Sequence, residues 1–166
     1  MDVSIKKHPF VKLQDWNKKM NVRIKKLSEN ATIPTYGTDY AAGADLYACI
    51  EEPVSIGCGE TKMIGTGVAM EIPTGYVGLV FARSGLACKK GLAPANKVGV
   101  IDSDYRGEIK VALHNHNGSG DALCVDNGER IAQISIVPYL KADFEVVENL
   151  EDTERGEGGF GSTGKF

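Results

Sequence analysis

The apolar residues of this chain come in short runs separated by turn-forming residues, and this pattern decides its fold class. Within residues 108–114 the apolar Ile109, Val111 and Leu113 alternate with other residues, as in a strand with one buried face. Turn signals such as 117–121 and 126–128 contain several of the chain's 20 glycines, which permit tight reversals. Comparable runs cover residues 65–72, 76–82, 130–137 and 144–147, and a strand-like alternation occupies 22–25. The sequence therefore predicts an all-β protein.

One segment predicts a helix, and it is short. Ser84 is a suitable N-cap residue and Gly91 a suitable C-terminal stop. Together with the strands, this favours a jelly-roll-like β-sandwich in a single domain, which a chain of 166 residues accommodates. We divide the chain into a basic extension (1–20), a β domain (21–150) and a glycine-rich C-terminal segment (151–166), whose low apolar content predicts a mobile tail.

The charge distribution argues against stable binding of nucleic acid. The formal net charge is −3, although residues 1–27 carry +6 and the remaining residues −9. A protein that grips a phosphate backbone normally needs a basic surface. An acidic body that handles a smaller polyanion would need local cations and a metal ion.

The cysteines and the N-terminal residues indicate the compartment. Cys49, Cys58, Cys88 and Cys124 form no C-x-x-C pair, so they favour free thiols in a reducing compartment over a zinc ribbon or a redox site. No stretch has the apolar length of a signal peptide or a membrane span. We therefore expect no secretion signal, no membrane contact and a cytoplasmic location, or a nuclear one in a eukaryote.

Four loop segments concentrate acidic, basic and hydroxyl side chains beside glycines. Arg83, Ser84 and Gly85 stand at the predicted helix start, where free N–H groups attract phosphate, although capping alone explains them equally well. Asp102 stands near Tyr105, and this acid could ligate a metal ion, orient water or form an Asx-turn. The four segments are residues 42–46, 82–87, 96–107 and 155–165.

Two further motifs have simpler explanations. Residues 159–165 nearly match the Walker A pattern, but Phe166 replaces the required Ser or Thr and no helix follows, so a P-loop is excluded and a phosphate-binding nest or a linker remains. His114 and His116 could face zinc from one side of a strand. Without a third ligand at suitable spacing, solvent-facing histidines are the preferred interpretation.

Taken together and in order, five segments resemble the motifs of the trimeric dUTP pyrophosphatase family. They are residues 42–48, 83–87, 99–107, 128–133 and 155–162, and the resemblance runs from about residue 22 to 165. It implies a jelly-roll homotrimer with active sites built from three subunits. It also implies Mg²⁺-dependent hydrolysis of dUTP to dUMP and pyrophosphate, which limits uracil in DNA and supplies dUMP for thymidylate synthesis.

The resemblance also implies roles for individual residues. Asp102 would deprotonate the water that attacks the α-phosphorus, and Asp45 would hold Mg²⁺ through water. Tyr105 would exclude a ribose 2′-hydroxyl. The residues expected to contact the phosphates are Arg83, Ser84, Gly85 and Gln133, and those expected to read the uracil are Asn96, Val98, Gly99 and Val100. In the tail, Arg155 would reach the γ-phosphate, Phe160 would stack on uracil, and Gly161, Ser162 and Thr163 would wrap the phosphates.

Two alternatives remain open at this stage. A dCTP deaminase would share the fold, but we find no groups beside Asp102 that suit attack on the base. A catalytically silent β-sandwich that binds a protein partner would not need the acids, arginines and tail aromatic that this chain retains.

Overall fold

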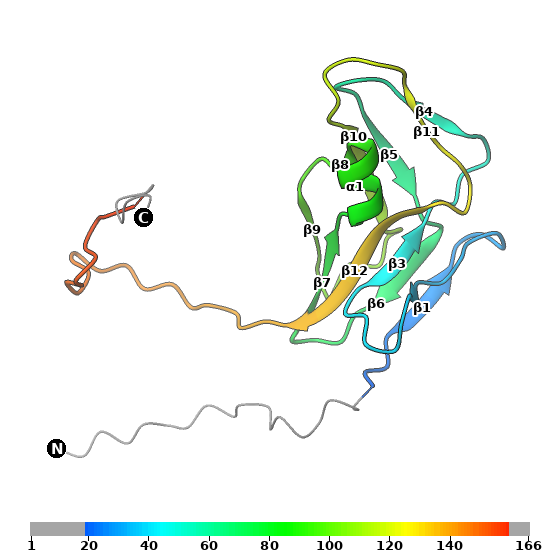
Figure 1. Ribbon diagram of the computed structural model, residues 1–166. Helices are drawn as coiled ribbons and strands as arrows, with labels where there is room; N and C mark the ends of the chain where they lie inside the picture. Colours follow the sequence, from blue (N-terminus) through cyan, green and yellow to red (C-terminus); the bar gives the residue numbers. More distant parts are fainter. Residues whose placement is uncertain (1–18, 160–166) are drawn as a thin grey trace.

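The computed structural model describes residues 19–159 and shows the expected all-β protein with one short helix (Figure 1). The first strands are β1 (Arg23–Lys26), β2 (Thr35–Tyr36), β3 (Ala44–Tyr47), β4 (Val54–Ile56), β5 (Thr61–Gly65), β6 (Val68–Glu71) and β7 (Tyr76–Phe81). After α1 (Ser84–Lys90) come β8 (Leu92–Pro94), β9 (Val98–Ile101), β10 (Lys110–Asn115), β11 (Leu123–Val125) and β12 (Arg130–Pro138).

The strands form small antiparallel sheets around one core. The largest has the order β2-β3-β12-β7-β9, and a second has the order β5-β10-β8. Two-stranded pairs β1-β6 and β11-β4 complete the layers. Such packing of short antiparallel strands confirms the predicted sandwich.

The core follows from the strand alternation seen in the sequence. In β10 the buried residues Val111 and Leu113 alternate with less buried neighbours, as a period of two requires. Ile109 lies just before the strand and is also fully buried. The predicted inward face is therefore confirmed, and it packs against residues from the other sheets such as Leu46 and Ile131.

Helix α1 begins one residue earlier than expected, which corrects its cap. Arg83, with extended backbone angles, is the N-cap residue and makes no side-chain capping bond, so Ser84 is the first helical residue and not the cap. The C-terminal prediction is confirmed, because Gly91 adopts the left-handed conformation with φ 73° and its N–H donates to the Ala87 oxygen at 3.1 Å.

The predicted strand at residues 144–147 is wrong. Tyr139 N donates to Gly75 O at 3.0 Å, and beyond it the chain runs away from the sheets without forming a strand (Figure 1). Leu140, Phe144 and Val146 are almost fully exposed. The alternation of apolar residues is present, but within the described chain this segment has no neighbouring strand to pair with.

Candidate functional site

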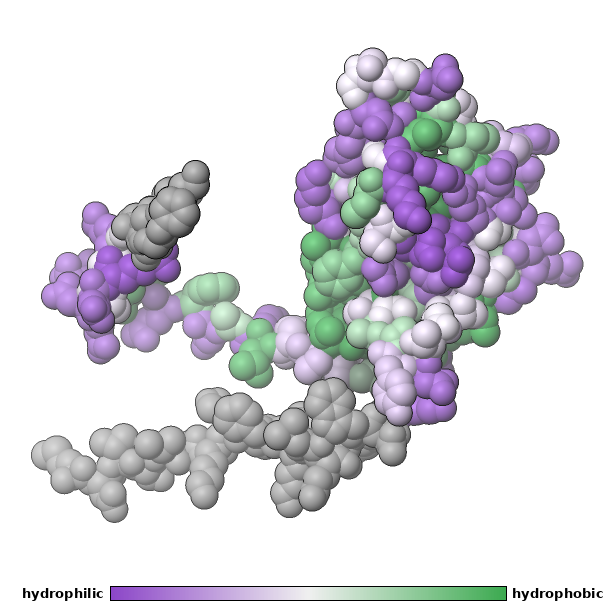
Figure 2. Space-filling view, in the orientation of Figure 1, coloured by the Kyte–Doolittle hydropathy of each residue, from purple (hydrophilic) through white to green (hydrophobic). Residues whose placement is uncertain are grey.

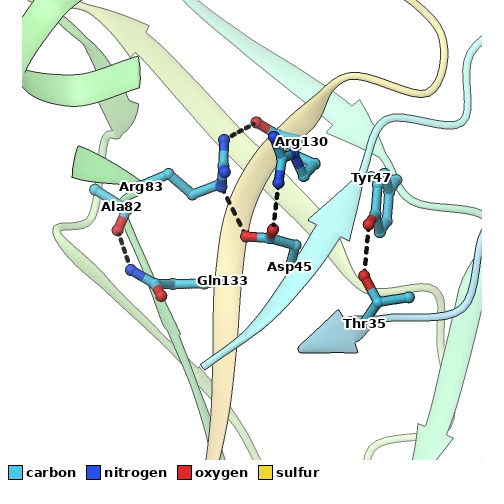
Figure 3. Close-up of polar contacts among 7 residues, drawn as sticks. All are labelled: Thr35, Asp45, Tyr47, Ala82, Arg83, Arg130 and Gln133. Carbon is cyan, nitrogen blue, oxygen red and sulfur yellow. Dashed lines mark hydrogen bonds and ion pairs between the residues drawn. The ribbon is translucent and has the colours of Figure 1, made fainter. Parts of the chain in front are cut away.

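An aspartate held by two arginines is the polar centre of the largest sheet (Figure 3). Asp45 lies in β3 directly opposite Gln133 in β12. Its Oδ1 accepts from Arg83 Nε at 2.7 Å and its Oδ2 from Arg130 Nη1 at 3.2 Å. Only 12% of the Asp45 side chain is exposed. Two cations against one carboxylate give this cluster a net positive charge, which suits an anionic ligand.

A break in strand regularity brings Arg130 to this cluster. In a regular strand, residues 130 and 133 would point to opposite faces because side chains alternate. The pairing shifts instead between Arg130, opposite Tyr47, and Ala132, opposite Leu46. Such a bulge changes the direction of the neighbouring side chain, so the side chains of Arg130 and Gln133 both lie on the face of the sheet that carries Asp45. The sequence analysis placed Arg130 within the segment 128–133 but gave it no role, since its position beside Asp45 depends on this shift.

Hydrogen bonds fix Ala82 and Arg83, which follow β7, on the face of the sheet that carries Asp45. Gln133 Nε2 donates to Ala82 O at 2.8 Å, and Arg83 Nη1 donates to Arg130 O at 3.3 Å. A Cβ at Gly43 would stand 2.6 Å from Gln133 Oε1, so the absent side chain leaves room for the amide. The structure therefore brings three predicted residues, Asp45, Arg83 and Gln133, together with Arg130. Ser84 and Gly85 lie exposed in the first turn of α1.

A second group of predicted residues lines two adjoining cavities beside β9. Asp102 and Tyr105 line a cavity of about 330 Å³ together with Val100, Glu108 and other residues. A smaller cavity of about 150 Å³ is lined by Asn96, Gly99 and Val100. Met63, Val100, Ile101 and Lys110 border both cavities. This group offers a space lined by both apolar and charged side chains, with the Asp102 carboxylate among them.

The ring of Tyr105 is held in a defined place. Its hydroxyl donates to Glu108 O at 3.0 Å, and its backbone N–H donates to Asp102 O at 3.2 Å. A Cβ at Gly107 would overlap the Tyr105 side chain, so glycine at this position allows the ring to fold back. The tyrosine is thereby fixed next to the predicted catalytic acid.

Within one chain Asp102 lies far from Arg83, although the Val98 end of the second group lies close to it. Strand β9 pairs with β7 so that Val98 is opposite Phe81 and Ile101 opposite Gly78. Arg83 therefore lies beyond one end of this ladder, and Asp102 beyond the other. Six residues of strand separate them, which corresponds to roughly 20 Å. One chain therefore does not bring Asp102 to the residues expected to bind phosphate.

Of the predicted site residues in the C-terminal tail, only Arg155 lies within the described part of the chain. Arg155 lies in a local turn, where its Nε donates to Gly158 O at 2.7 Å, and it contacts neither group. Phe160, Gly161, Ser162 and Thr163 lie outside the described residues.

The described residues suit a Mg²⁺ ion that is coordinated mainly by a bound ligand and that contacts Asp45 through water molecules. Residues 19–159 contain no cluster of three or more His, Cys, Asp or Glu side chains suited to direct coordination. A carboxylate has about four acceptor positions, and the two arginines occupy two of those on Asp45. The remaining positions can accept from the hydration shell that Mg²⁺ tends to keep.

Comparison with known proteins identifies the family. The dUTPase family model matches residues 29–164. A deoxyuridine 5′-triphosphate nucleotidohydrolase of Nautilia profundicola is 54% identical over 146 residues, covering 88% of this chain and 100% of the relative. The chain belongs to the dUTPase family. Its activity is accordingly that of a dUTP diphosphatase, which hydrolyses dUTP to dUMP.

Solved structures agree with the fold of this dUTPase. The dUTPase of Staphylococcus bacteriophage 80alpha with dUPNHPP is 32% identical and has a TM-score of 0.76, covering 88% of this chain and 99% of that one. A mutant dUTPase from phage phi11 of S. aureus, which has a structural Mg(II) ion, is 28% identical with a TM-score of 0.69 and covers 80% of this chain and 100% of that one. In the described part of the chain, no helix has the length and apolar character needed to cross a membrane.

Replacing Arg130 by alanine should weaken dUTP binding more than it slows turnover. The change removes one positive charge beside Asp45, and Arg83 then faces the carboxylate alone. Because 51% of the Arg130 side chain is exposed, solvent screens its effect, and we expect a loss of about 1 kcal/mol, or roughly five-fold in kcat/KM, mainly through KM.

Steady-state kinetics of the alanine and lysine variants would test this role. Arg130→Lys should recover part of KM because it restores the charge without the planar guanidinium. Arg23→Ala is the matched control, since Arg23 pairs with Glu71 on the exposed surface of β1 and β6. Equal KM values for Arg130→Ala and the control would contradict the assignment.

Proposed function

We propose that this dUTPase works as a homotrimer in which each active site combines the Asp45 group of one copy with the Asp102 group of another. The observation that carries the proposal is the separation of Asp102 from Arg83 along β7 and β9 within one chain. The Asp45 group is fixed by its own hydrogen bonds, and Tyr105 is held beside Asp102, yet the reaction needs the base and the phosphate ligands around one phosphorus atom. A second copy supplies the missing half.

The Asp45 group would bind the triphosphate. Arg83 offers a guanidinium already oriented by Asp45, and a planar fork matches phosphate oxygens. The Gln133 amide and the exposed first turn of α1, with Ser84 and Gly85, lie on the same side. These residues would hold the phosphate chain and keep the leaving pyrophosphate in line with the attacking water.

The cavities beside β9 would hold deoxyuridine. Strand β9 is the edge of its sheet, since β7 is its only described partner. Alternate residues of β9 therefore direct their backbone N–H and C=O groups away from β7 and could read a base, while the Val98 N–H already donates to Asn96 O at 2.7 Å. Asn96 adds a side-chain amide from the preceding turn. Cytosine exchanges the donors and acceptors of uracil and would leave such groups unpaired.

The reaction would then be a general-base hydrolysis. The Asp102 carboxylate accepts a proton from a water molecule, and the water oxygen forms a bond to the α-phosphorus while the bond to the bridging oxygen of pyrophosphate breaks. Mg²⁺, held by the phosphates and through water by Asp45, would polarise the phosphates and neutralise charge on the leaving group. The 80alpha dUTPase with dUPNHPP supports binding of the triphosphate in this family.

Exposed apolar surface supports the trimer. Val100 is 61% exposed and Met63 63% exposed, and Figure 2 shows apolar residues on the side of the body where β7 and β9 lie in Figure 1. The segment after Tyr139 leaves Leu140, Phe144 and Val146 in solvent. An alternating apolar segment of this kind suits strand pairing on a neighbouring copy.

Cellular context completes the proposal. Cys49, Cys58, Cys88 and Cys124 are free thiols, in keeping with a reducing compartment. We place the enzyme in the cytoplasm, or in the nucleus of a eukaryote, where removal of dUTP limits uracil in DNA and yields dUMP for thymidylate synthesis.

A complementation experiment tests the shared site. Asp102→Asn should lower kcat by about 10²- to 10⁴-fold through loss of the base, and Arg83→Ala should also be nearly inactive. Mixed trimers of the two variants contain sites that take an intact Asp102 from one copy and an intact Arg83 from another. Random mixing should restore about a quarter of the sites.

The controls separate assembly from chemistry. Asp104→Asn, a matched change in the exposed residue two positions later, should keep normal turnover. Light scattering should report three chains per particle for every variant. If mixed trimers form and remain inactive, or if a monomer is fully active, the shared-site proposal is wrong.

Tyr105→Ala should relax selection against ribose. We propose that the fixed ring fills the space that a 2′-hydroxyl would need, so its removal should raise the ratio of kcat/KM for UTP to that for dUTP. Tyr105→Phe keeps the ring and removes only the hydrogen bond to Glu108 O, and it should leave the ratio unchanged. An unchanged ratio in Tyr105→Ala would place the selection elsewhere.

We further propose that residues 155–166 close over the bound nucleotide. Arg155 would reach the γ-phosphate, Phe160 would stack on uracil, and Gly161, Ser162 and Thr163 would wrap the phosphates. A chain that ends at residue 154 should form the same trimer, because the last strand within residues 19–159 ends at Pro138. Its kcat/KM should fall by at least about 100-fold through loss of stacking and charged contacts. Removal of residues 2–18 is the control, and equal rates for the two truncations would contradict the closure.

A further inference from the structure

Two histidines outside the dUTP site lie together at the C-terminal end of β10. His114 is the next-to-last residue of the strand and His116 directly follows it, and their rings are in contact. Their ring centroids are 4.5 Å apart and the rings meet edge to face at 68°. Of the three histidines in the chain, these two form a pair that dUTP hydrolysis does not use.

The pair already has nearly the spacing of two metal ligands. With metal–nitrogen bonds of about 2.0–2.1 Å and a tetrahedral angle, two imidazole ligands of one ion have ring centroids about 5 Å apart. The observed 4.5 Å is close to this value, and rotation about the side-chain bonds can turn one nitrogen of each ring toward a shared ion. His116 is exposed and His114 half-buried, so an ion can reach both rings from solvent.

One ring is oriented by a neighbouring strand. Thr61, directly opposite His114 in the pairing of β5 with β10, places its Oγ1 2.9 Å from His114 Nδ1. When Nδ1 carries the proton and donates to this oxygen, Nε2 keeps its lone pair for a metal. An oxygen that accepts from the second ring nitrogen is the usual orienting partner of a metal-binding histidine.

The strand beneath the pair is rigid. Asn115, between the two histidines, is fully buried, and its Nδ2 donates to Ile56 O at 3.0 Å. His116 N donates to Gly91 O at 2.8 Å. Because the backbone on both sides of the pair is fixed, little conformational freedom would be lost when an ion binds.

Charge acts in both directions at this position. Desolvation lowers the pKa of His116, and the positive charges of Lys97 and His114 add to this lowering, which favours the neutral ring that metals bind. Lys97 also opposes a bound cation directly. Glu60, just before β5, and Lys62 flank Thr61 and pair with each other at 2.6 Å, so their charges nearly cancel.

We propose that His114 and His116 form a binding site for one divalent transition-metal ion, with water in the remaining coordination positions. Imidazole nitrogen suits Ni²⁺, Cu²⁺ and Zn²⁺, whereas Mg²⁺ prefers oxygen. The site is therefore chemically distinct from the magnesium position at Asp45 and should bind its ion in an excess of Mg²⁺.

Calorimetric titration with Ni²⁺ in excess Mg²⁺ tests the site on the full chain. The unsubstituted protein should bind one ion per chain, and His114→Ala or His116→Ala should each weaken binding at least about ten-fold. His8→Ala is the matched control and should bind as the unsubstituted protein does. Circular dichroism should show the same β structure in all variants, since both paired histidines are at the surface.

Two further measurements locate the ion. Bound Cu²⁺ should show coupling to two imidazole nitrogens by electron paramagnetic resonance, and to one in either alanine variant. Lys97→Gln should tighten Ni²⁺ binding by up to about five-fold because it removes a nearby positive charge. Absence of binding, an equal loss in His8→Ala, retained affinity in both His variants, or no tightening in Lys97→Gln would overturn the proposal.

Discussion

The ion cluster around Asp45 is the interaction on which the arrangement of the site depends. One carboxylate joins three segments that are distant in the sequence: β3, the start of α1 and the start of β12. A mostly buried carboxylate needs compensation, and two guanidinium groups provide more than its charge requires. The surplus positive charge and the orientation of Arg83 arise from the same contacts, so fold stability and affinity for an anion are coupled here.

Sequence reasoning succeeded where local pattern determines structure. The alternation around Val111 and Leu113 fixed the inward face of β10, and Gly91 ended α1 as its conformational freedom suggests. The same reasoning failed where the structure of a segment depends on contacts with other parts of the chain. Residues 144–147 have a strand pattern but no described partner. Arg83 is the N-cap of α1 because its backbone is extended, while its side chain binds Asp45 and Arg130.

The candidate site was predicted by residue type but not by arrangement. Asp45, Arg83 and Gln133 do meet, whereas Asp102 lies about 20 Å from them within the chain, a separation that only the β7–β9 register reveals. Arg130 could not be placed beforehand, because the bulge between Arg130 and Ala132 changes the face toward which it points. Pairing irregularities depend on two strands at once and leave little trace in either sequence.

The edge position of β9 connects recognition with assembly. An exposed edge strand with apolar side chains is normally avoided, because its free backbone groups and its apolar surface attract other chains. Here Val98 and Val100 are both exposed on such an edge, and Gly99 lies between them. A nucleobase can use the free backbone groups, while a neighbouring copy can cover the apolar side chains. The feature that would make a lone chain prone to aggregation is thus explained if β9 lies between a bound nucleotide and a second subunit.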